Sequence, residues 1–209
     1  MAILGFDISS RKVGYAFLVD ESKVPLKKHY GTIELGSKLN LSEKLVLFRD
    51  KAQKLIEKFK PDVVVVEDVY IRHLSSAIIL SRFSGVFIEL CKRITNKEAI
   101  LILTTRARAA LELKNSKEEA FKFVVEKFGF KNWKFETHND ISDAFIVCLA
   151  FLRGVDGRAS RKVARAKKEK GGSGEKTSEP KDSVNCKEKE QDGEQKKKRV
   201  RKNKGPSTE

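Results

Sequence analysis

The sequence predicts a mixed α/β fold, in which helices pack on a single sheet. Short apolar runs that suit strands alternate with longer segments whose apolar residues recur at helical spacing. The first three strand patterns follow one another through short links, which favours an antiparallel meander. Two later strand patterns are separated by a helical one, which favours parallel pairing. The expected order is three strands, a helix, a strand, a helix, a strand and two helices.

Five segments are expected to be strands. Ala2–Ile8 is a nearly continuous apolar run, which suits a buried strand. Val13–Val19 and His29–Leu35 complete the expected meander. Asp62–Val66 reads DVVVV between two helical patterns, as expected for a buried parallel strand, and Ala99–Leu103 is a further apolar strand.

Four segments repeat apolar residues three or four positions apart, and we expect helices at Ser42–Phe59, Ser75–Ile94, Asn115–Phe128 and Asp140–Leu152. Ser42 is the expected N-cap of the first helix, and Pro61 closes that segment. Ser116, with Glu119 three residues later, has the spacing of a capping box.

The last quarter of the chain differs from the rest in composition. Val155–Glu209 has no aromatic residue and few aliphatic ones, so it cannot bury enough apolar surface to offset the entropy of ordering. We therefore expect a folded domain over residues 1–154 and a disordered basic tail over residues 155–209. The tail holds 18 Lys and Arg against 10 Asp and Glu, and the remainder holds 26 against 19. Both parts are basic, which favours a nucleic-acid partner over a role in solubility alone.

Other features exclude several classes of protein. Cys91, Cys148 and Cys186 form no CxxC pair, which argues against a disulfide framework or a zinc site and fits a reducing compartment. No apolar run approaches the ~18 residues of a membrane span. The N-terminus has neither the basic region nor the cleavage site of a signal peptide. We expect an intracellular protein that is not secreted and does not bind a membrane.

Four acidic residues lie where a carboxylate is costly or where active sites form. Asp7 lies in the first apolar run, and Glu67 follows DVVVV at the C-terminal end of a strand. Asp140 and Asp143 are three residues apart, so they share a face of a helix. A turn or a helix N-terminus would explain any one acid alone. Together, four acids on three elements predict a site for Mg²⁺, which prefers oxygen ligands. Two such ions about 4 Å apart can drive phosphodiester hydrolysis, and we expect that Mn²⁺ can replace Mg²⁺.

The segments that contain these acids resemble the motifs of the RuvC-type Holliday junction resolvases, within the RNase H-like superfamily. The motifs are ILGFDISSRKVGYA, FKPDVVVVEDVYIRHLSSAIILSRFSGV and HNDISDAFIVCLAF, and the resemblance covers roughly Met1 to Arg153. It implies an RNase H-like five-stranded sheet, with three antiparallel and then two parallel strands, and helices on both faces. The chain departs from the family's pattern at Ser9, where a glycine is expected, although Gly14 is kept.

The resemblance also implies roles for residues near the acids. Lys117 falls where the family has a basic residue close to the scissile phosphate, and we include it among the catalytic residues. Arg108 has a similar position, with Arg106 as the alternative. Tyr70 matches an aromatic residue that stacks on bases at the junction centre, and Arg72 is grouped with it as DNA-binding. Apart from this resemblance, these basic residues fit a solvated surface, and Tyr70 fits the core.

Other features carry less weight. The run GGSGEKTS has Glu175 where a phosphate-binding loop needs glycine, and no strand precedes it, so no nucleotide cofactor is expected. The run KKKRVRK at Lys196–Lys202 fits a nuclear import signal or a phosphate-binding tail equally well. His138 is either a ligand or a surface residue. Asp68 should point away from Glu67 on a strand, so it is left out of the site.

These features predict a metal-dependent, structure-selective endodeoxyribonuclease that resolves four-way DNA junctions by paired cuts. The alternatives are a related nuclease acting on flaps, forks or RNA, and a catalytically silent nucleic-acid-binding module. Branched DNA is the expected partner, so the protein should be associated with DNA in the cytoplasm, the nucleoid or a nucleus.

The Ser75–Ile94 helix carries more apolar residues than one sheet-facing stripe requires. This surplus predicts a homodimer built on that helix, with Phe87 on its free face. The competing interpretation is that the Asn115–Phe128 helix covers the surplus within one chain.

Overall fold

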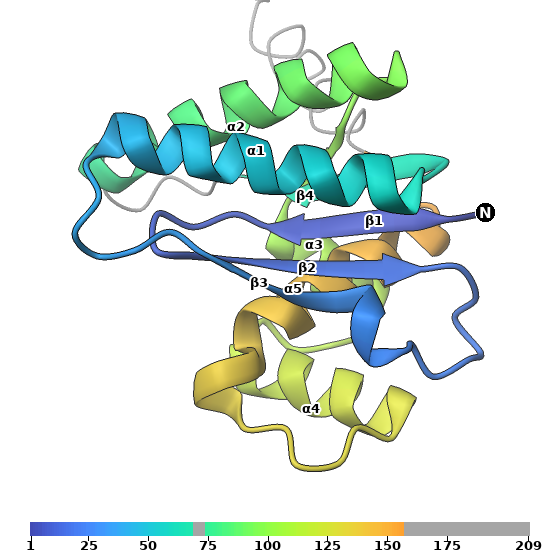
Figure 1. Ribbon diagram of the computed structural model, residues 1–209. Helices are drawn as coiled ribbons and strands as arrows, with labels where there is room; N and C mark the ends of the chain where they lie inside the picture. The colour runs from blue at the N-terminus through green and yellow to red at the C-terminus, as the bar shows by residue number, and fades with distance from the viewer. Residues whose placement is uncertain (69–73, 157–209) are drawn as a thin grey trace, which may run out of the picture. The chain divides into compact units, whose positions relative to one another are not determined.

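Five strands form one mixed sheet in the computed structural model, which describes residues 1–68 and 74–156. The strands are β1 (Ile3–Asp7), β2 (Lys12–Leu18), β3 (Tyr30–Glu34), β4 (Val63–Glu67) and β5 (Ile100–Ile102). Their order across the sheet is β3-β2-β1-β4-β5 (Figure 1). β2 pairs antiparallel with β1 and β3, whereas β4 pairs parallel with β1 and β5. This arrangement confirms the expected sheet of three antiparallel and then two parallel strands.

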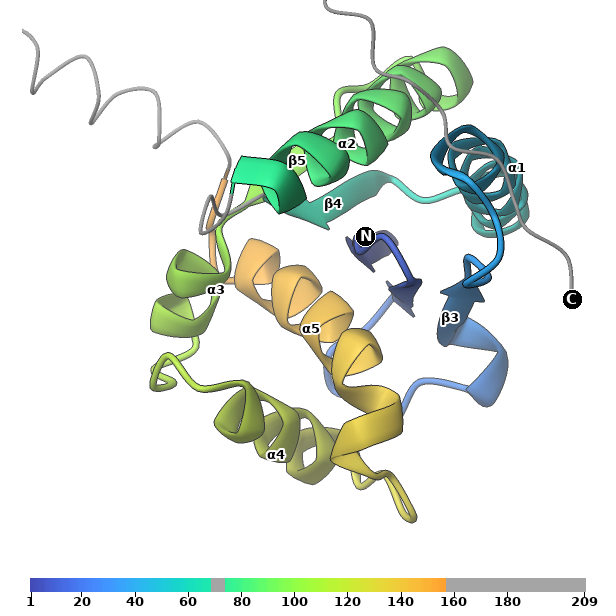
Figure 2. The same cartoon turned by 90° about the vertical axis from the view of Figure 1, so that its left-hand side faces the viewer.

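Helices cover both faces of the sheet, as expected. Those in the described part of the chain are α1 (Leu41–Phe59), α2 (Leu74–Thr95), α3 (Thr104–Ala110), α4 (Lys117–Phe128) and α5 (Phe135–Leu152), with a short 3-10 helix at Lys27–His29. α1 and α2 lie on one face, and α5 lies on the other with α3 and α4 beside it (Figure 2). The sheet therefore separates two apolar clusters, one beneath α1 and α2 and one beneath α5.

Side chains of β1 alternate between these two clusters. Leu4 and Phe6 belong to the cluster beneath α1 and α2, where the Phe6 ring centroid lies 4.7 Å from that of Phe87. Ile3 belongs instead to the cluster beneath α5. Because successive side chains of a strand point to opposite faces, Asp7 lies on the α5 side of the sheet.

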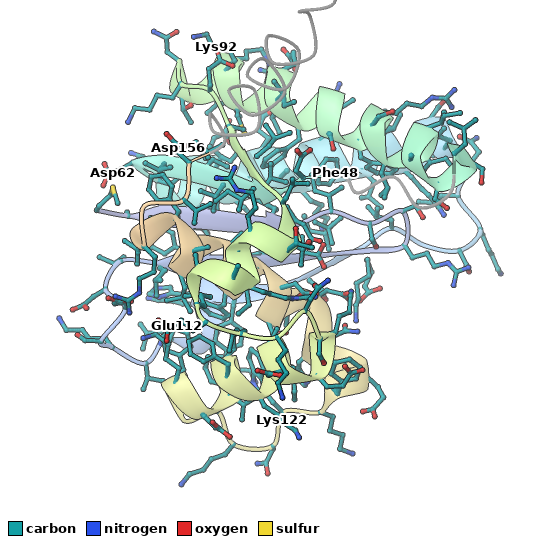
Figure 3. The ribbon with its side chains drawn as sticks, turned by 180° about the vertical axis from the view of Figure 1, so that it is seen from behind. Phe48, Asp62, Lys92, Glu112, Lys122 and Asp156 are labelled. Atoms are coloured by element: carbon teal, nitrogen blue, oxygen red, sulfur yellow. The ribbon has the colours of Figure 1, made fainter. Side chains whose placement is uncertain are left out.

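Aromatic rings fill much of the cluster beneath α1 and α2. The ring centroid of Phe48 lies 5.4 Å from that of Phe83 and 5.9 Å from that of Phe87. Figure 3 shows Phe48 among the packed side chains of the interior, whereas the exposed Lys92 and Lys122 lie at the periphery. α1 thus buries its apolar side against α2 and the sheet.

Two glycines allow α5 to approach the sheet closely. A Cβ atom on Gly14 would lie 2.0 Å from the carbonyl oxygen of Asp140, and one on Gly5 would lie 2.4 Å from Sγ of Cys148. Neither space admits a methyl group, so both positions require glycine. Gly14 pairs with Asp7 across β1 and β2, and the close approach therefore brings α5 over the end of β1.

The observed helices differ from the expected ones at one cap, at one helix start and by one additional helix. The N-cap of α1 is Asn40 and not Ser42, because Asn40 and Glu43 form a capping box with hydrogen bonds of 3.0 Å and 2.8 Å. α5 begins at Phe135, five residues before the expected Asp140. α3 was not expected, because seven residues are too few to show an apolar period.

α4 begins at Lys117, two residues after the expected Asn115, and its N-cap is the expected Ser116. The Ser116 hydroxyl accepts a hydrogen bond from the Glu119 backbone N–H at 3.3 Å, which confirms the expected cap. The Glu119 carboxylate accepts from the Lys114 backbone N–H at 3.1 Å. The expected capping box at α4 is therefore only half formed.

Beyond α5, the described chain ends at Asp156. The Val155 backbone N–H donates to the Ala150 carbonyl at 3.1 Å, and its side chain packs against the cluster beneath α5. The rest of the expected basic tail, residues 157–209, lies outside the described residues.

Among the described helices, α2 alone is long and apolar enough to cross a membrane by length and composition, with a mean hydropathy of 1.5 over its most apolar window. The segment is not a continuous apolar run, because Arg82 and Glu89 interrupt it. The Phe83, Phe87 and Leu90 side chains are fully buried beneath α1 and α2. This packing accounts for part of the apolar character of α2, because 33% of that window is buried.

Candidate active site

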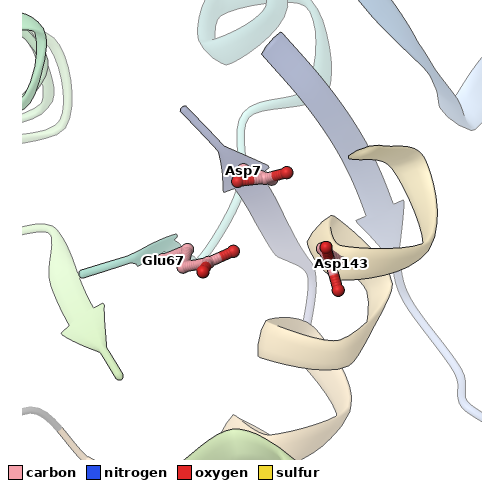
Figure 4. A group of neighbouring side chains, drawn as sticks. All are labelled: Asp7, Glu67 and Asp143. Atoms are coloured by element: carbon pink, nitrogen blue, oxygen red, sulfur yellow. The ribbon is translucent and has the colours of Figure 1, made fainter. Parts of the chain in front are cut away.

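Three carboxylates converge at the edge of the sheet where β1 and β4 end. Asp7, Glu67 and Asp143 each place one oxygen within 4.8 Å of the others (Figure 4). Asp7 and Asp143 are buried, with 9% and 2% of their surface exposed, and Glu67 is half-buried. We call these three residues the acidic trio.

The backbone around the acidic trio explains why its members meet. β1 and β4 are parallel neighbours in which Phe6 pairs with Val66, so Asp7 and Glu67 follow side by side at their C-terminal ends. The two-residue period of a strand points both carboxylates to the α5 face. Asp143 lies on α5, which the glycines of β1 and β2 allow to pack closely over the same edge.

Burial and the repulsion between neighbouring carboxylates make ionisation of Asp7 and Glu67 costly. The pKa of Asp7 is raised well above its usual value, first by burial and then by the charges of Glu67 and Asp143. The pKa of Glu67 is also raised, by burial and by the charge of Asp143, although a hydrogen bond from Thr104 opposes the shift. A divalent cation between these oxygens would relieve both costs. The donor set is oxygen only, which fits a hard ion such as Mg²⁺.

Two cationic side chains form ion pairs with Asp143, one with each carboxylate oxygen. Nη2 of Arg108 lies 3.2 Å from Oδ1, and Nζ of Lys117 lies 3.3 Å from Oδ2. Arg108 also donates to the Asn115 side-chain oxygen at 3.1 Å, and its Nε is buried with no hydrogen-bond partner among the described residues. Only 5% of Arg108 is exposed, whereas the Lys117 side chain is 54% exposed. Arg106, the alternative to Arg108, is half-buried on α3, and no ion pair of the described residues joins it to the acidic trio.

Lys117 responds to the negative charge of the acidic trio. Burial alone would lower the pKa of its ammonium, but the charges of Asp143, Asp7 and Glu67 outweigh that effect, and the pKa is raised. Lys117 is therefore held as a cation beside Asp143 while part of its side chain remains accessible to solvent.

Sequence reasoning did not identify Thr104, whose hydroxyl donates a hydrogen bond to the Glu67 carboxylate. Thr104 is the first residue of α3 and follows the end of β5 closely. Glu67 pairs with Ile102 across β4 and β5, so both residues lie at the same edge of the sheet. The rule that sites collect at the C-terminal ends of parallel strands would have pointed to this residue.

The fourth predicted acid, Asp140, lies apart from the acidic trio. Its carboxylate forms an ion pair with Lys12 at 3.0 Å, and the two side chains are 18% and 24% exposed. Because α5 begins at Phe135, Asp140 and Asp143 lie in its second and third turns. A preference of acidic residues for the helix N-terminus therefore does not explain either acid.

The remaining predicted residues lie outside the acidic trio or outside the described residues. The His138 ring stacks on Trp133, with centroids 4.8 Å apart, in the first turn of α5. Asp68 directly follows β4, and its backbone N–H donates to the Ile102 carbonyl at 2.9 Å. Tyr70 and Arg72 lie in residues 69–73, which the structure does not describe.

Comparison with known proteins identifies related sequences over the described domain. A family model described as crossover junction endodeoxyribonuclease RuvC matches residues 3–151. The RuvC protein of Dictyoglomus thermophilum is 22% identical over 75% of this chain and 99% of its own length. That of Fusobacterium nucleatum is 21% identical over 77% of this chain and 84% of its own length.

A solved structure shares the fold. Thermus thermophilus RuvC in complex with a Holliday junction substrate aligns with a TM-score of 0.62 and 18% identity, covering 73% of this chain and 93% of that one. At this identity, the similarity bears on the fold alone, which is the expected RNase H-like arrangement of sheet and helices.

Proposed function

The chain belongs to the RuvC family of crossover junction endodeoxyribonucleases, and we propose that its acidic trio is the centre at which that activity occurs. As a member of this family, it is an endonuclease that resolves Holliday junctions, and its action depends on a metal ion. The protein is intracellular and associated with the DNA on which it acts. The observation that carries the proposal is the convergence of Asp7, Glu67 and Asp143 within 4.8 Å at one edge of the sheet.

We infer that the metal is Mg²⁺, held as two ions, and that Mn²⁺ can replace it. The oxygen-only donor set and the repulsion within the acidic trio support this choice. Bound divalent ions would supply a water of lowered pKa and would stabilise the charge on the attacked phosphate.

The protein's own residues hold this centre in place. Asp7 and Glu67 are fixed by the ends of neighbouring strands, and Thr104 orients the Glu67 carboxylate through its hydroxyl. Arg108 holds one oxygen of Asp143 from the buried side. Lys117 lies on the solvent side of Asp143, and we propose that its ammonium contacts the phosphate next to the cut.

We retain Asp140 in the proposed ligand set, because it lies on α5 one turn before Asp143. To act there, its carboxylate would have to exchange Lys12 for a cation. Asp140→Asn separates the two possibilities. Cutting that falls with this variant supports a fourth ligand, and cutting at the wild-type rate would remove Asp140 from the set.

The central test is replacement of two acids. Asp7→Asn and Glu67→Gln should each reduce cutting of a labelled four-way junction by at least about 10²–10³-fold, because a ligand charge is lost. DNA binding should be largely retained. Asp50→Asn and Glu98→Gln are matched controls, since both acids are exposed and paired with basic residues away from the acidic trio. Full activity in EDTA, or in either site variant, would contradict the proposal.

A panel of substrates distinguishes the proposed specificity from its alternatives. Wild-type protein with Mg²⁺ should cut a four-way junction in paired positions, and faster than a flap, a fork, a linear duplex or an RNA–DNA hybrid. Preference for a flap, fork or hybrid would support the related nuclease. Binding without cutting of any of these would support the silent binding module.

We also propose that the protein is a homodimer through α2. The competing interpretation, in which the Asn115–Phe128 helix covers the surplus apolar face, is wrong, because α4 packs beside α5 on the opposite side of the sheet. Phe87 was wrongly assigned to the free face, since its side chain is fully buried against Phe6. The exposed apolar residues of α2 are Leu74 and Ile78, which are 72% and 44% exposed.

Gly85 lies on this same side of α2, with open space around it, so a second helix could approach closely. Ile78→Glu should therefore give a folded monomer that nicks one strand of a junction without making paired cuts. Val24→Glu is the matched control, because Val24 is also exposed but lies in the β2–β3 connection. Sedimentation of the wild type as a monomer, both free and on junction DNA at micromolar concentration, would contradict the dimer.

A further inference from the structure

One side of α1 carries a stripe of lysines. Lys44, Lys51 and Lys58 are spaced seven residues apart, which is close to two helical turns, so they share a side of the helix. Lys54 lies between the last two at the intervals of three and four that place residues on one face. The acidic residues of α1 repeat with the same period on the adjacent side, at Glu43, Asp50 and Glu57. Arg49 lies outside both stripes and pairs with Asp50, and Lys54 lies between the stripes, four residues after Asp50 and three before Glu57.

The lysine stripe forms one wall of a groove beside β3. This groove has a volume of about 350 Å³. On the α1 side it is lined by Lys51, Lys54, Leu55 and Lys58, and on the sheet side by Tyr15, Thr32, Ile33 and Glu34. β3 is an edge strand, so the groove opens along the side of the sheet. We call it the lysine groove.

The lysines of this groove have no anionic partner in the described part of the chain. None of the ion pairs found there includes Lys51, Lys54 or Lys58. The ammonium of Lys58 lies 5.0 Å from the centre of the Phe59 ring. Glu34 is the one acid that lines the groove, and its carboxylate accepts a hydrogen bond from Thr32 at 3.3 Å. Three cations against one acid leave the groove positively charged.

The stripe begins at the edge of the sheet that carries the acidic trio. Nζ of Lys44 donates to the carbonyl of Ser10 at 3.4 Å, and Ser10 lies in the turn that follows Asp7. α1 then runs away from this edge, alongside β1 and β3 (Figure 1). From Lys44 to Lys58 the helix rises by about 21 Å at 1.5 Å per residue.

We propose that the lysine groove binds the phosphate backbone of a duplex arm that leaves the cut site. This inference rests on the proposed function. Exposed lysines attract phosphates without reading bases, which suits an arm of any sequence. At 3.4 Å of axial rise per base pair, the stripe matches about six base pairs of duplex. The alternative occupant is an acidic protein segment that pairs with the edge strand β3. DNA is favoured because the lysine stripe begins at the edge of the sheet that carries the acidic trio.

The test neutralises the groove without touching the acidic trio. Lys51→Gln, Lys54→Gln and Lys58→Gln are combined in one variant, and its affinity for a four-way junction is measured against salt concentration without divalent cations. The slope of log K against log[salt] should become shallower by about 2–3, because each lost phosphate contact contributes about 0.9. With Mg²⁺ and saturating junction, kcat should match the wild type while KM rises.

The matched control carries the same change of charge elsewhere. Lys92→Gln, Lys122→Gln and Lys131→Gln replace three exposed lysines of α2, α4 and the α4–α5 connection, none of which lines the lysine groove. This variant should keep the wild-type slope. Both triple variants should melt at the wild-type temperature, because the replaced side chains are exposed. The difference between the groove variant and the wild type should shrink when junction arms are trimmed below about six base pairs, since the arm then no longer spans the stripe.

An unchanged slope in the groove variant would overturn the proposal. So would an equal loss of slope in the two variants, which would indicate general charge rather than a groove. If the groove variant keeps its slope but loses affinity for a poly-glutamate peptide that the wild type binds, an acidic protein segment is the occupant and the proposal is wrong. A wild-type protein that binds a junction but cuts no DNA would contradict the proposed function alone, because the slope is measured without cutting.

Discussion

The acidic trio and the lysine groove are both strongly charged, but they are constructed in opposite ways. Two members of the acidic trio are buried and the third is half-buried. The trio comes from three elements, and a buried arginine pairs with one of its members. The lysine groove is exposed, and its charge comes from lysines of one helix that form no ion pair within residues 1–68 and 74–156. Buried charges need partners at fixed positions, so their geometry is specific. Exposed charges need none, are screened by salt and supply affinity without specificity.

The largest effect should come from removing the buried partner. Arg108→Met leaves Asp143 with one cation fewer and leaves the Asn115 side chain without its donor. Breaking a buried pair in this way should lower the free energy of unfolding by about 3–5 kcal/mol, as measured by urea denaturation. Cutting should fall with it. The salt dependence of DNA binding should stay at the wild-type value, because Arg108 is too buried to contact a phosphate.

Lys117→Met provides the contrast, because Lys117 contacts the same carboxylate from the solvent side. Its effect on the free energy of unfolding should be below about 1 kcal/mol, as for other partly exposed ion pairs. The salt slope of DNA binding should become shallower by about 1, as expected for one phosphate contact. Equal effects of the two variants on both stability and salt slope would show that Arg108 and Lys117 do not have separate roles.

The close packing of α5 should produce the next largest effect. Gly14→Ala would place a methyl group 2.0 Å from the Asp140 carbonyl, so α5 must move away from the sheet. Such overpacking should cost about 1–3 kcal/mol of unfolding free energy, and cutting should fall because Asp143 moves with α5. Gly85→Ala, made in the Ile78→Glu background and compared with Ile78→Glu alone, is the matched control, since a Cβ there meets open space within the chain.

In the Ile78→Glu background, where dimer contacts at that side of α2 are removed, Gly85→Ala should raise stability by up to about 1 kcal/mol, because alanine is the better helix former. A Gly14→Ala variant as stable and as active as the wild type would contradict the view that this contact positions the acidic trio.

The sequence predicted the acids that a local pattern marks, but it did not predict the buried partner that distant contacts create. Asp7 and Glu67 stand out because a strand-ending acid in an apolar run needs a reason, and the two-residue period then places both on one face. Such signals are local. Arg108 is buried through contacts with α5 and with the turn before α4, and nothing near it in the sequence indicates this. The sequence therefore suggested a phosphate contact for Arg108, whereas the structure gives it a partner within the protein.

Asp140 illustrates a limit of spacing arguments. Residues three apart on a helix share a face only approximately, since three steps of about 100° leave them about 60° apart. That difference is enough for Asp143 to turn towards β1 while Asp140 turns towards Lys12. Phe87 shows the same limit, because an apolar surplus on α2 does not reveal which apolar residues face the sheet.

The smallest expected effect is an increase in the free energy of unfolding, opposite in sign to the losses expected above. It tests directly whether the buried acids destabilise the protein. Without divalent cations, Asp7→Asn should raise the free energy of unfolding by on the order of 1 kcal/mol at neutral pH, because a buried like charge is removed. The comparison is made by thermal or urea denaturation in EDTA. Asp50→Asn, in which an exposed acid loses its charge, should show no such gain.

The pH dependence of this gain follows from the direction of the pKa shift. The pKa of Asp7 is higher in the folded protein than in the unfolded chain, so the folded state holds the proton more tightly. Stability from this group is complete below the unfolded pKa and is lost as pH rises through the folded value. The gain in unfolding free energy from Asp7→Asn should therefore be small in acid and grow as pH rises.

Mg²⁺ should stabilise the wild type by mass action and the variant much less, so that in Mg²⁺ the wild type becomes the more stable of the two. If Asp7→Asn is less stable than the wild type in EDTA at every pH, repulsion between the carboxylates of the acidic trio does not destabilise the folded protein. The main physical reason for a cation at this site would then be lost.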